Sequence, residues 1–222
     1  MARNAGALAV RGLAAALVLG TGAALFAQDS TEIKPEDLFA SAKAAYGEKK
    51  YGKTLADLQL LVGAVSKLRI EQLKPLLPAA PEGWKAEDAS GESIGGGMMF
   101  GAGLTLKRDY RKAAAAGAED SGDSAHMSVE LMVNSPLVGM IAPMLSNPSM
   151  LQGQEGMSVI NVKGKKSLLE WHKDSKSGNL KILLGDNTTL LTIQGEGIQK
   201  ADLSDVFAKA VDVEKLEKAL AE

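Results

Sequence analysis

Residues 127–134 read Met-Ser-Val-Glu-Leu-Met-Val-Asn, and this stretch decides the fold class. Its odd-numbered positions are all apolar, whereas three of its four even-numbered positions are polar. A period of two is typical of a strand that buries one face, because successive side chains point to opposite sides of a sheet. Residues 104–110 alternate in the same way. We therefore expect the two strands to pair as a long hairpin across residues 113–125, which are small, polar or acidic.

More strands are expected after this hairpin. Short apolar runs bounded by turn-forming residues predict them at about residues 157–162, 166–173, 179–184 and 188–194. The chain then ends in helix, because apolar residues from Leu203 to Val211 recur at helical spacing and Asp212 can cap a last short helix. Short strands joined by tight turns favour an antiparallel sheet of about six strands. The predicted fold class is α+β, with helices covering one face of the sheet.

The N-terminal part reads as two helices. Pro35, followed by Glu36 and Asp37, suits the first turn of a helix that ends before residue 47. A second helix is expected from about residue 53 to residue 74. Its apolar residues recur at threes and fours, which indicates one buried stripe. These residues are Leu55, Leu58, Leu61, Val62, Val65 and Leu68.

These patterns divide the chain into four segments. Residues 1–27 form a targeting segment, residues 28–76 a helical hairpin, residues 77–84 a proline-rich joint, and residues 85–222 the sheet domain. The joint cannot continue a helix, because proline lacks the backbone N–H and restricts the residue before it. The patterns leave open whether the hairpin packs on the sheet or stands away from it as an arm that grips a partner.

The targeting segment has the features of a cleaved export signal. Arg3 and Arg11 give it a positive start, residues 12–26 carry no charge, and Ala27 offers a small residue for cleavage. The apolar run is about 15 residues, shorter than the roughly 20 that a membrane-spanning helix needs. A retained anchor is the alternative. We expect a periplasmic or secreted bacterial protein whose mature chain does not span a membrane.

Composition excludes several classes of partner. The chain has a net charge of −2, and without residues 1–27, which hold two arginines and no acid, 23 basic and 27 acidic residues give −4. An acidic chain is a poor ligand for nucleic acid, which requires a basic face. Methionines gather between residues 127 and 157, and their thioethers could bind copper(I), but flexible core filling is the favoured interpretation. No cofactor and no metal site are expected.

One motif suggests catalysis. Residues 91–95, Gly-Glu-Ser-Ile-Gly, match the nucleophile elbow of serine hydrolases, and acidic residues, His126 and His172 follow in the order that this class uses. The elbow needs an apolar strand before it and a helix after it, but residues 84–89 include Lys85, Glu87 and Asp88, and glycines follow the motif. A flexible glycine loop and a non-enzymatic protein are therefore the predictions, and a serine hydrolase is an alternative.

The segment 136–150 is the predicted binding site. Residues 136–145 are apolar on every side of a possible helix, and no charged residue follows until Glu155. Such a helix is either sandwiched in a core or open on one side as an adaptable, methionine-rich lid. The predicted contact residues are Leu137, Met140, Ile141, Met144 and Leu145.

These observations together predict a non-catalytic binding or accessory module. Its partner is expected to be an envelope protein, or else a lipid or apolar small molecule. Besides the hydrolase, the alternative is a structural envelope component that associates with itself through the helical hairpin.

Three stretches resemble an uncharacterised family of exported bacterial proteins. They are the joint at 77–84, the strand end Lys-Arg-Asp-Tyr at 107–110, and the proline-containing turns at 134–137 and 146–148. The likeness extends from about Tyr46 to Leu220 and implies export without a particular activity. The order of strands and helices is also similar to small PsbP/Mog1-type domains, which implies an accessory or binding role and transfers no site residues.

Overall fold

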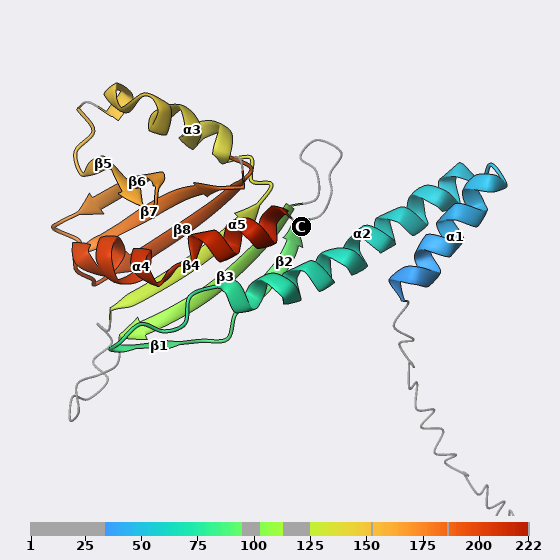
Figure 1. Cartoon of the computed structure of the whole chain (residues 1–222), viewed down its shortest axis with the longest axis horizontal. Coiled ribbons are helices and arrows are strands. Elements are labelled where there is room, and N and C mark those ends of the chain that lie inside the picture. Colours follow the sequence, from blue (N-terminus) through green and yellow to red (C-terminus); the bar gives the residue numbers. More distant parts are fainter. Residues whose placement is uncertain (1–33, 95–102, 113–124, 152, 186, 222) are drawn as a thin grey trace, which may run out of the picture. The chain divides into compact units, whose positions relative to one another are not determined.

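An antiparallel sheet organises the part of the chain that the structure describes, which comprises residues 34–94, 103–112, 125–151, 153–185 and 187–221. In this computed structural model eight strands join in the order β1-β3-β4-β8-β7-β6-β5, and β2 also pairs with β3 (Figure 1). Their bounds are β1 Trp84–Ala86, β2 Ser90–Ile94, β3 Gly103–Lys112, β4 His126–Val133, β5 Met157–Val162, β6 Lys165–His172, β7 Ser177–Leu184 and β8 Thr189–Glu196.

The predicted α+β class is confirmed, and each of the six expected strands is present. Strands β3 and β4 pair as the expected hairpin, with Leu104 opposite Val133 and Tyr110 opposite Met127. Strands β5 to β8 then form a meander, and β8 returns to pair with β4. Every pairing in the described sheet is antiparallel.

Two short edge strands, β1 and β2, escaped the sequence pattern. Strand β2 takes up residues 91–94 of the predicted glycine loop, and Gly95 lies outside the described residues. A Cβ atom at Gly91 would lie 2.5 Å from Ile70 Cγ2, so only glycine lets the end of helix α2 approach this strand so closely. Glycine has no side chain, so residues 90–94 do not show the alternation of apolar and polar side chains that would predict a strand.

Helices precede, interrupt and follow the sheet. Their bounds are α1 Pro35–Gly47, α2 Tyr51–Leu73, η1 Lys74–Leu76, α3 Val138–Ser146, η2 Pro148–Leu151, η3 Asp202–Phe207, α4 Ala208–Ala210 and α5 Val213–Ala221. Pro35 stands in the first turn of α1, as expected. Asp212 caps α5 as predicted, because its Oδ1 accepts a hydrogen bond of 3.1 Å from the Lys215 backbone N–H.

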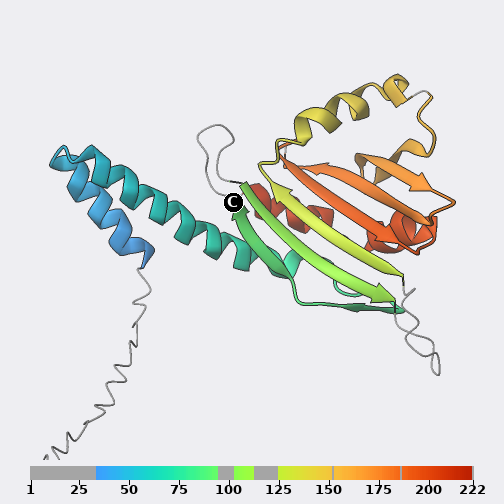
Figure 2. The same ribbon diagram turned by 180° about the vertical axis from the view of Figure 1, so that it is seen from behind.

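The main core lies on one face of the sheet. Helices α4 and α5 lie in front of the strands in Figure 1 and behind them in Figure 2, and the end of α2 joins them in one apolar cluster. Phe207 packs edge-on against Tyr110 and Trp84, with ring centroids 4.9 and 5.1 Å away. The Tyr110 hydroxyl donates a hydrogen bond of 2.7 Å to the Pro78 carbonyl. Burial raises the pKa of Tyr110 to about 12.

The sheet is covered on both faces, which corrects the expectation of a single covered face. Strands β6, β7 and β8 contain consecutive buried leucines, of which Leu168, Leu183 and Leu190 face a second apolar cluster under α3. Their neighbours, such as Leu169 and Leu191, face the main core. A run of apolar residues with no polar alternation is typical of a strand buried on both sides.

Among the described helices, none is both long and apolar enough to span a bilayer. The predicted export signal at residues 1–27 lies outside the described residues. Export therefore stays a prediction.

Candidate functional site

Helix α3 has one buried side and one open side. Val138, Ile141 and Leu145 recur at threes and fours and are buried against the sheet. Met140 is 66% exposed and Leu137 40% exposed. The predicted contact residues are therefore divided, because Ile141 and Leu145 belong to the core, Leu137 and Met140 are open, and Met144 is half-buried. The sequence left two alternatives for this segment, a helix buried in a core and a lid that is open on one side. The buried side of α3 fits the first alternative and the exposed side fits the second.

The open side of α3 is continued by the turn that follows it. Met150 in η2 is exposed, whereas Leu151 next to it is buried in the second cluster. We call the apolar side chains that stay open along this segment the α3 surface. Its members are Leu137, Met140 and Met150, and the half-buried Met144 lies at its edge.

A rigid base supports the α3 surface. Ser135 is buried, and its Oγ accepts a hydrogen bond of 3.2 Å from the Leu137 backbone N–H just before α3 begins. The Ser135 backbone N–H donates to the Thr188 carbonyl at 3.0 Å, which ties the start of the segment to the turn before β8. The exposed methionines are thus carried by a helix that is fixed at its start and along its buried side.

A cavity of about 310 Å³ adjoins the C-terminal end of α3. Its walls combine apolar side chains with two lysines, and the Lys165 ammonium forms an ion pair of 2.6 Å with Glu217. The residues that line it are Ala142, Leu145, Ser146, Gly164, Lys165, Lys166, Leu183, Leu184 and Asn187. This mixed lining suits a small polar ligand better than a lipid chain, which requires a mostly apolar pocket.

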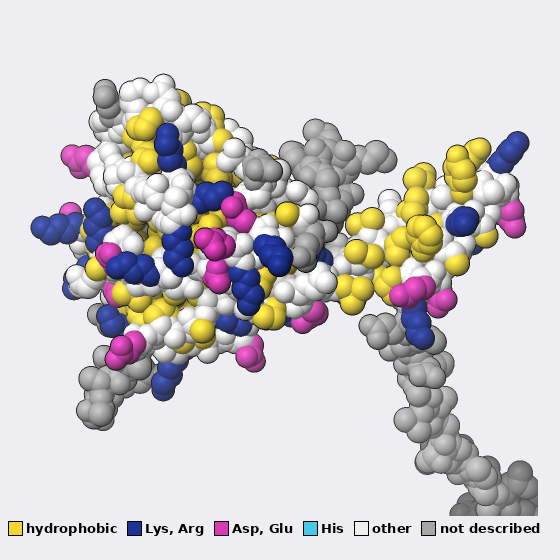
Figure 3. Space-filling view, in the orientation of Figure 1, with side chains coloured by type: hydrophobic (Ala, Val, Ile, Leu, Met, Phe, Trp, Pro, Cys, Tyr) yellow, Lys and Arg dark blue, Asp and Glu magenta, His cyan; other side chains and the backbone are white. Residues whose placement is uncertain are grey.

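The helical hairpin carries a second open apolar surface. The stripe that the sequence indicated as buried is largely exposed, and Leu55 is 63% open. Figure 3 shows hydrophobic side chains gathered over α1 and α2 on the face in view. We call the open apolar side chains of this face the hairpin stripe. They are Phe39 and Tyr46 of α1, and Tyr51, Leu55, Leu58, Val62, Val65 and Leu68 of α2.

Helix α1 packs on a different side of α2, which explains the wrong expectation. The buried residues of α2 opposite α1 include Thr54 and Asp57, and α1 contributes Leu38, Ala42 and Ala45. Alanines allow the two helices to approach closely, but they cover little of the neighbouring leucines. Further along the same helix, Ile70 and Leu73 are buried in the main core. The C-terminal end of α2 is therefore the part of the described hairpin that belongs to the main core.

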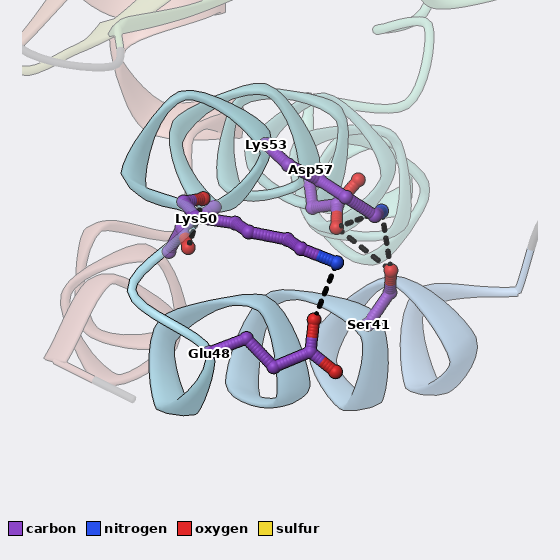
Figure 4. Close-up of polar contacts among 6 residues, drawn as sticks. Ser41, Glu48, Lys50, Lys53 and Asp57 are labelled. Atoms are coloured by element: carbon purple, nitrogen blue, oxygen red, sulfur yellow. Dashed lines mark hydrogen bonds and ion pairs between the residues drawn. The ribbon is translucent and has the colours of Figure 1, made fainter.

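A polar cluster lies between the two helices of the hairpin (Figure 4). The Lys53 ammonium donates hydrogen bonds to Asp57 Oδ2 at 2.7 Å and to Ser41 Oγ at 2.8 Å, and Ser41 Oγ donates to Asp57 Oδ2 at 2.7 Å. The hydrogen bonds from Lys53 and then from Ser41 hold the pKa of Asp57 below its ordinary value. These bonds orient α1 on α2 and place the charges away from the hairpin stripe.

The serine motif lacks the partners that a hydrolase needs. Ser93 pairs with Leu104, whereas His126 pairs with Arg111, seven residues further along the same strand β3. At about 3.3 Å per residue the two positions are displaced by roughly 23 Å along β3, and they also lie on opposite sides of that strand. The other histidine, His172, donates a hydrogen bond of 3.0 Å from Nε2 to the Glu170 carboxylate in β6. The structure thus brings neither histidine of the chain to Ser93.

A polar network on the sheet was not predicted. Glu170 Oε2 accepts a hydrogen bond of 2.9 Å from the Asn179 amide, while its other oxygen contacts His172. The Asn179 hydrogen bond is the main reason why the pKa of Glu170 lies below its ordinary value. Within the described ranges no group of three or more histidine or acidic side chains is placed to hold a metal ion. Glu170, His172 and Asn179 lie in strands β6 and β7. The alternation of side chains along each strand shows which residues share a face, but it does not show that residues of the two strands are in contact.

Comparison with protein-family models, curated proteins and solved structures finds no match to this chain. The function must therefore be inferred from the arrangement of its own residues.

Proposed function

We propose that this chain is a non-catalytic binding or accessory module, exported to the bacterial envelope, that holds an envelope protein through the α3 surface. The observation that carries this proposal is the exposure of Met140, which stays two-thirds open on a helix whose other side is buried. A large apolar side chain at this exposure costs free energy in water, at about 25 cal/mol per Å². A partner that covers it recovers that free energy.

The chemistry of the segment supports a protein partner. Residues 134–154 contain no charged side chain, so an apolar surface can approach without removing water from an ion. Methionine side chains are flexible and polarisable, and they adapt to partners of varied shape. A lipid or an apolar small molecule fits less well as a ligand, because the cavity beside α3 is lined partly by the charged side chains of Lys165 and Lys166.

In-cell photo-crosslinking tests this proposal. A photoreactive amino acid is placed at Met140 in one variant and at Lys209 in another, because Lys209 is exposed in α4 and lies outside the α3 surface. We expect one envelope protein, identified by mass spectrometry, to be captured from position 140 and not from position 209. The purified partner should then bind the unmodified chain and bind the Met140→Asp variant at least about tenfold more weakly.

Folding must be shown to survive the substitution. Met140 is exposed, so Met140→Asp should change the free energy of unfolding by no more than about 0.5 kcal/mol. Equal capture from positions 140 and 209, or an undiminished affinity of a folded Met140→Asp variant, would contradict the proposed site.

A further inference from the structure

The hairpin stripe has the spacing of a helix that packs in a bundle. On α2 the residues Tyr51, Leu55, Leu58, Val62 and Val65 follow one another at alternating steps of four and three. This is the a and d pattern of a heptad, and Leu61 and Leu68 add apolar residues at the g positions. A helix with apolar a, d and g positions is typical of bundles in which it contacts more than one neighbour.

Helix α1 covers only part of the apolar surface of α2. Tyr46 of α1 reaches the stripe, with its ring centroid 6.1 Å from that of Tyr51. Phe39, seven residues earlier, lies on the same side of α1 and is also exposed. The two helices thus present one continuous open stripe, which extends over about 25 Å from Tyr51 to Leu68.

We infer that a second copy of this chain covers the hairpin stripe, with the two hairpins packed antiparallel as a four-helix bundle. The open area fits this occupant. Eight side chains that are 40–66% exposed present on the order of 800 Å² of apolar surface, which is the share of one partner in an interface of standard size. A two-fold axis lets the same stripe serve both partners and closes the assembly.

The distribution of charge also fits a second copy. On α2, no a, d, e or g position from residue 51 to residue 68 carries a charge at neutral pH, so the α2 parts of two identical stripes can approach without repulsion between like charges. The charged residue nearest to the α1 part of the stripe by helical spacing is Lys43, which is exposed and lies between Phe39 and Tyr46. Lysines cluster instead at the turn between the helices, at positions 49, 50 and 53. Parallel packing would bring the lysine clusters of both copies together, whereas antiparallel packing places them at opposite ends of the bundle. Separation of the two lysine clusters therefore favours the antiparallel arrangement.

A matched pair of variants tests the stripe. Leu55 is on the stripe and is 63% exposed, whereas Leu60 is 57% exposed but lies on the opposite side of α2. Sedimentation of the protein purified after expression of the full-length chain should show dimers. Leu55→Asp should raise the dimer dissociation constant at least about tenfold, while Leu60→Asp should change it less than about twofold. Met140→Asp, on the α3 surface, should leave the dimer intact.

Engineered cysteines test the antiparallel register without adding charge. The chain contains no cysteine, so any disulfide reports the introduced pair alone. In the antiparallel register Leu55 of one copy faces Val65 of the other, because a positions meet d positions. Under mild oxidation a mixture of Leu55→Cys and Val65→Cys chains should form the mixed disulfide, and Leu55→Cys alone should not link to itself.

Several outcomes would overturn this inference. These are a protein that stays monomeric at every concentration, a dimer equally sensitive to Leu55→Asp and Leu60→Asp, or self-linked Leu55→Cys without the mixed disulfide. A membrane is the alternative to a second copy as the surface that covers the hairpin stripe, and vesicles of equimolar phosphatidylglycerol and phosphatidylethanolamine test it. If a monomer binds them and Leu55→Asp removes that binding, the stripe is a membrane surface and the second copy is excluded.

Discussion

Helices α2 and α5 carry the same apolar spacing, yet only one of them is covered. Leu55, Leu58 and Val62 of α2 are exposed, whereas in α5 the equally spaced Val213 and Leu216 are buried in the main core. The difference comes from what lies opposite each helix. Helix α5 packs on the sheet, whereas α1 packs on another side of this part of α2, with Leu38, Ala42 and Ala45 as its buried residues. Periodicity therefore shows that a helix has an apolar side, and the neighbouring elements decide whether that side is buried.

The largest expected effect separates the two helices directly. Leu216 has no exposed surface, so Leu216→Ala should lower the free energy of unfolding by about 2–5 kcal/mol through lost burial and a cavity. Leu55→Ala should change it by no more than about 0.5 kcal/mol when measured on single chains at low concentration. Urea denaturation measures both. A loss at Leu55 as large as that at Leu216 would mean that the stripe is buried within the monomer.

A smaller effect is expected where the proline-rich joint meets the face of the sheet that carries the main core. Tyr110→Phe removes the hydrogen bond to the Pro78 carbonyl, which also accepts one of 3.0 Å from Arg108. Because that carbonyl keeps a donor, the variant should be less stable by only about 1 kcal/mol. Thermal denaturation at neutral pH measures this loss.

Tyr110 also makes the stability of the main core depend on pH in the alkaline range. The pKa of Tyr110 is about 12 in the folded protein, above its ordinary value of 10.0, because burial disfavours the phenolate. Its contribution to stability is therefore complete below about pH 10 and is lost as the pH rises towards 12. The Tyr110→Phe variant should lose less stability over this alkaline range. An identical alkaline profile in both proteins would assign the loss to other groups.

The smallest expected effect lies in the hairpin. The pKa of Asp57 is lowered by Lys53 and Ser41, so its contribution to stability is present above the ordinary pKa of an aspartate, about 4, and is lost as the pH falls below it. Helicity of α1 and α2, followed by NMR at those residues, should therefore decrease on acidification before the sheet unfolds. The Asp57→Asn variant should show this weakened hairpin already at neutral pH, with less further change in acid.

The strands were predictable because their alternation is local. Met127 to Val133 alternate so regularly that neighbours such as Glu130 and Leu131 could be assigned to opposite faces from the sequence. Strand β2 could not be recognised, because its glycine carries no side chain and its role depends on Ile70, which is distant in the sequence. The second covered face was not predicted either, because it depends on α3 packing over Leu190 while Leu191 faces the main core, and a run of two leucines does not show which elements lie on each side.

The candidate site was predictable in position but not in detail. An uncharged segment at 134–154 identifies α3 as unusual, yet the choice between Ile141 as core and Met140 as open depends on how the helix is rotated on the sheet. The exposure of the hairpin stripe depends in the same way on Ser41, Lys53 and Asp57. Nothing in their spacing shows that this polar cluster, and not the leucines, lies between α1 and α2.

The outer edge of β3 is divided between two short partners. Strand β1 pairs with residues 110–112 and β2 with residues 103–107, and between them the Glu87 backbone N–H donates to the Asp109 carbonyl at 2.8 Å. A long strand whose amides are already taken offers no template for a foreign peptide to extend the sheet. At this margin of the sheet the outermost strands are thus β1 and β2, which are only three and five residues long, and such short edges are poor templates for fibril growth.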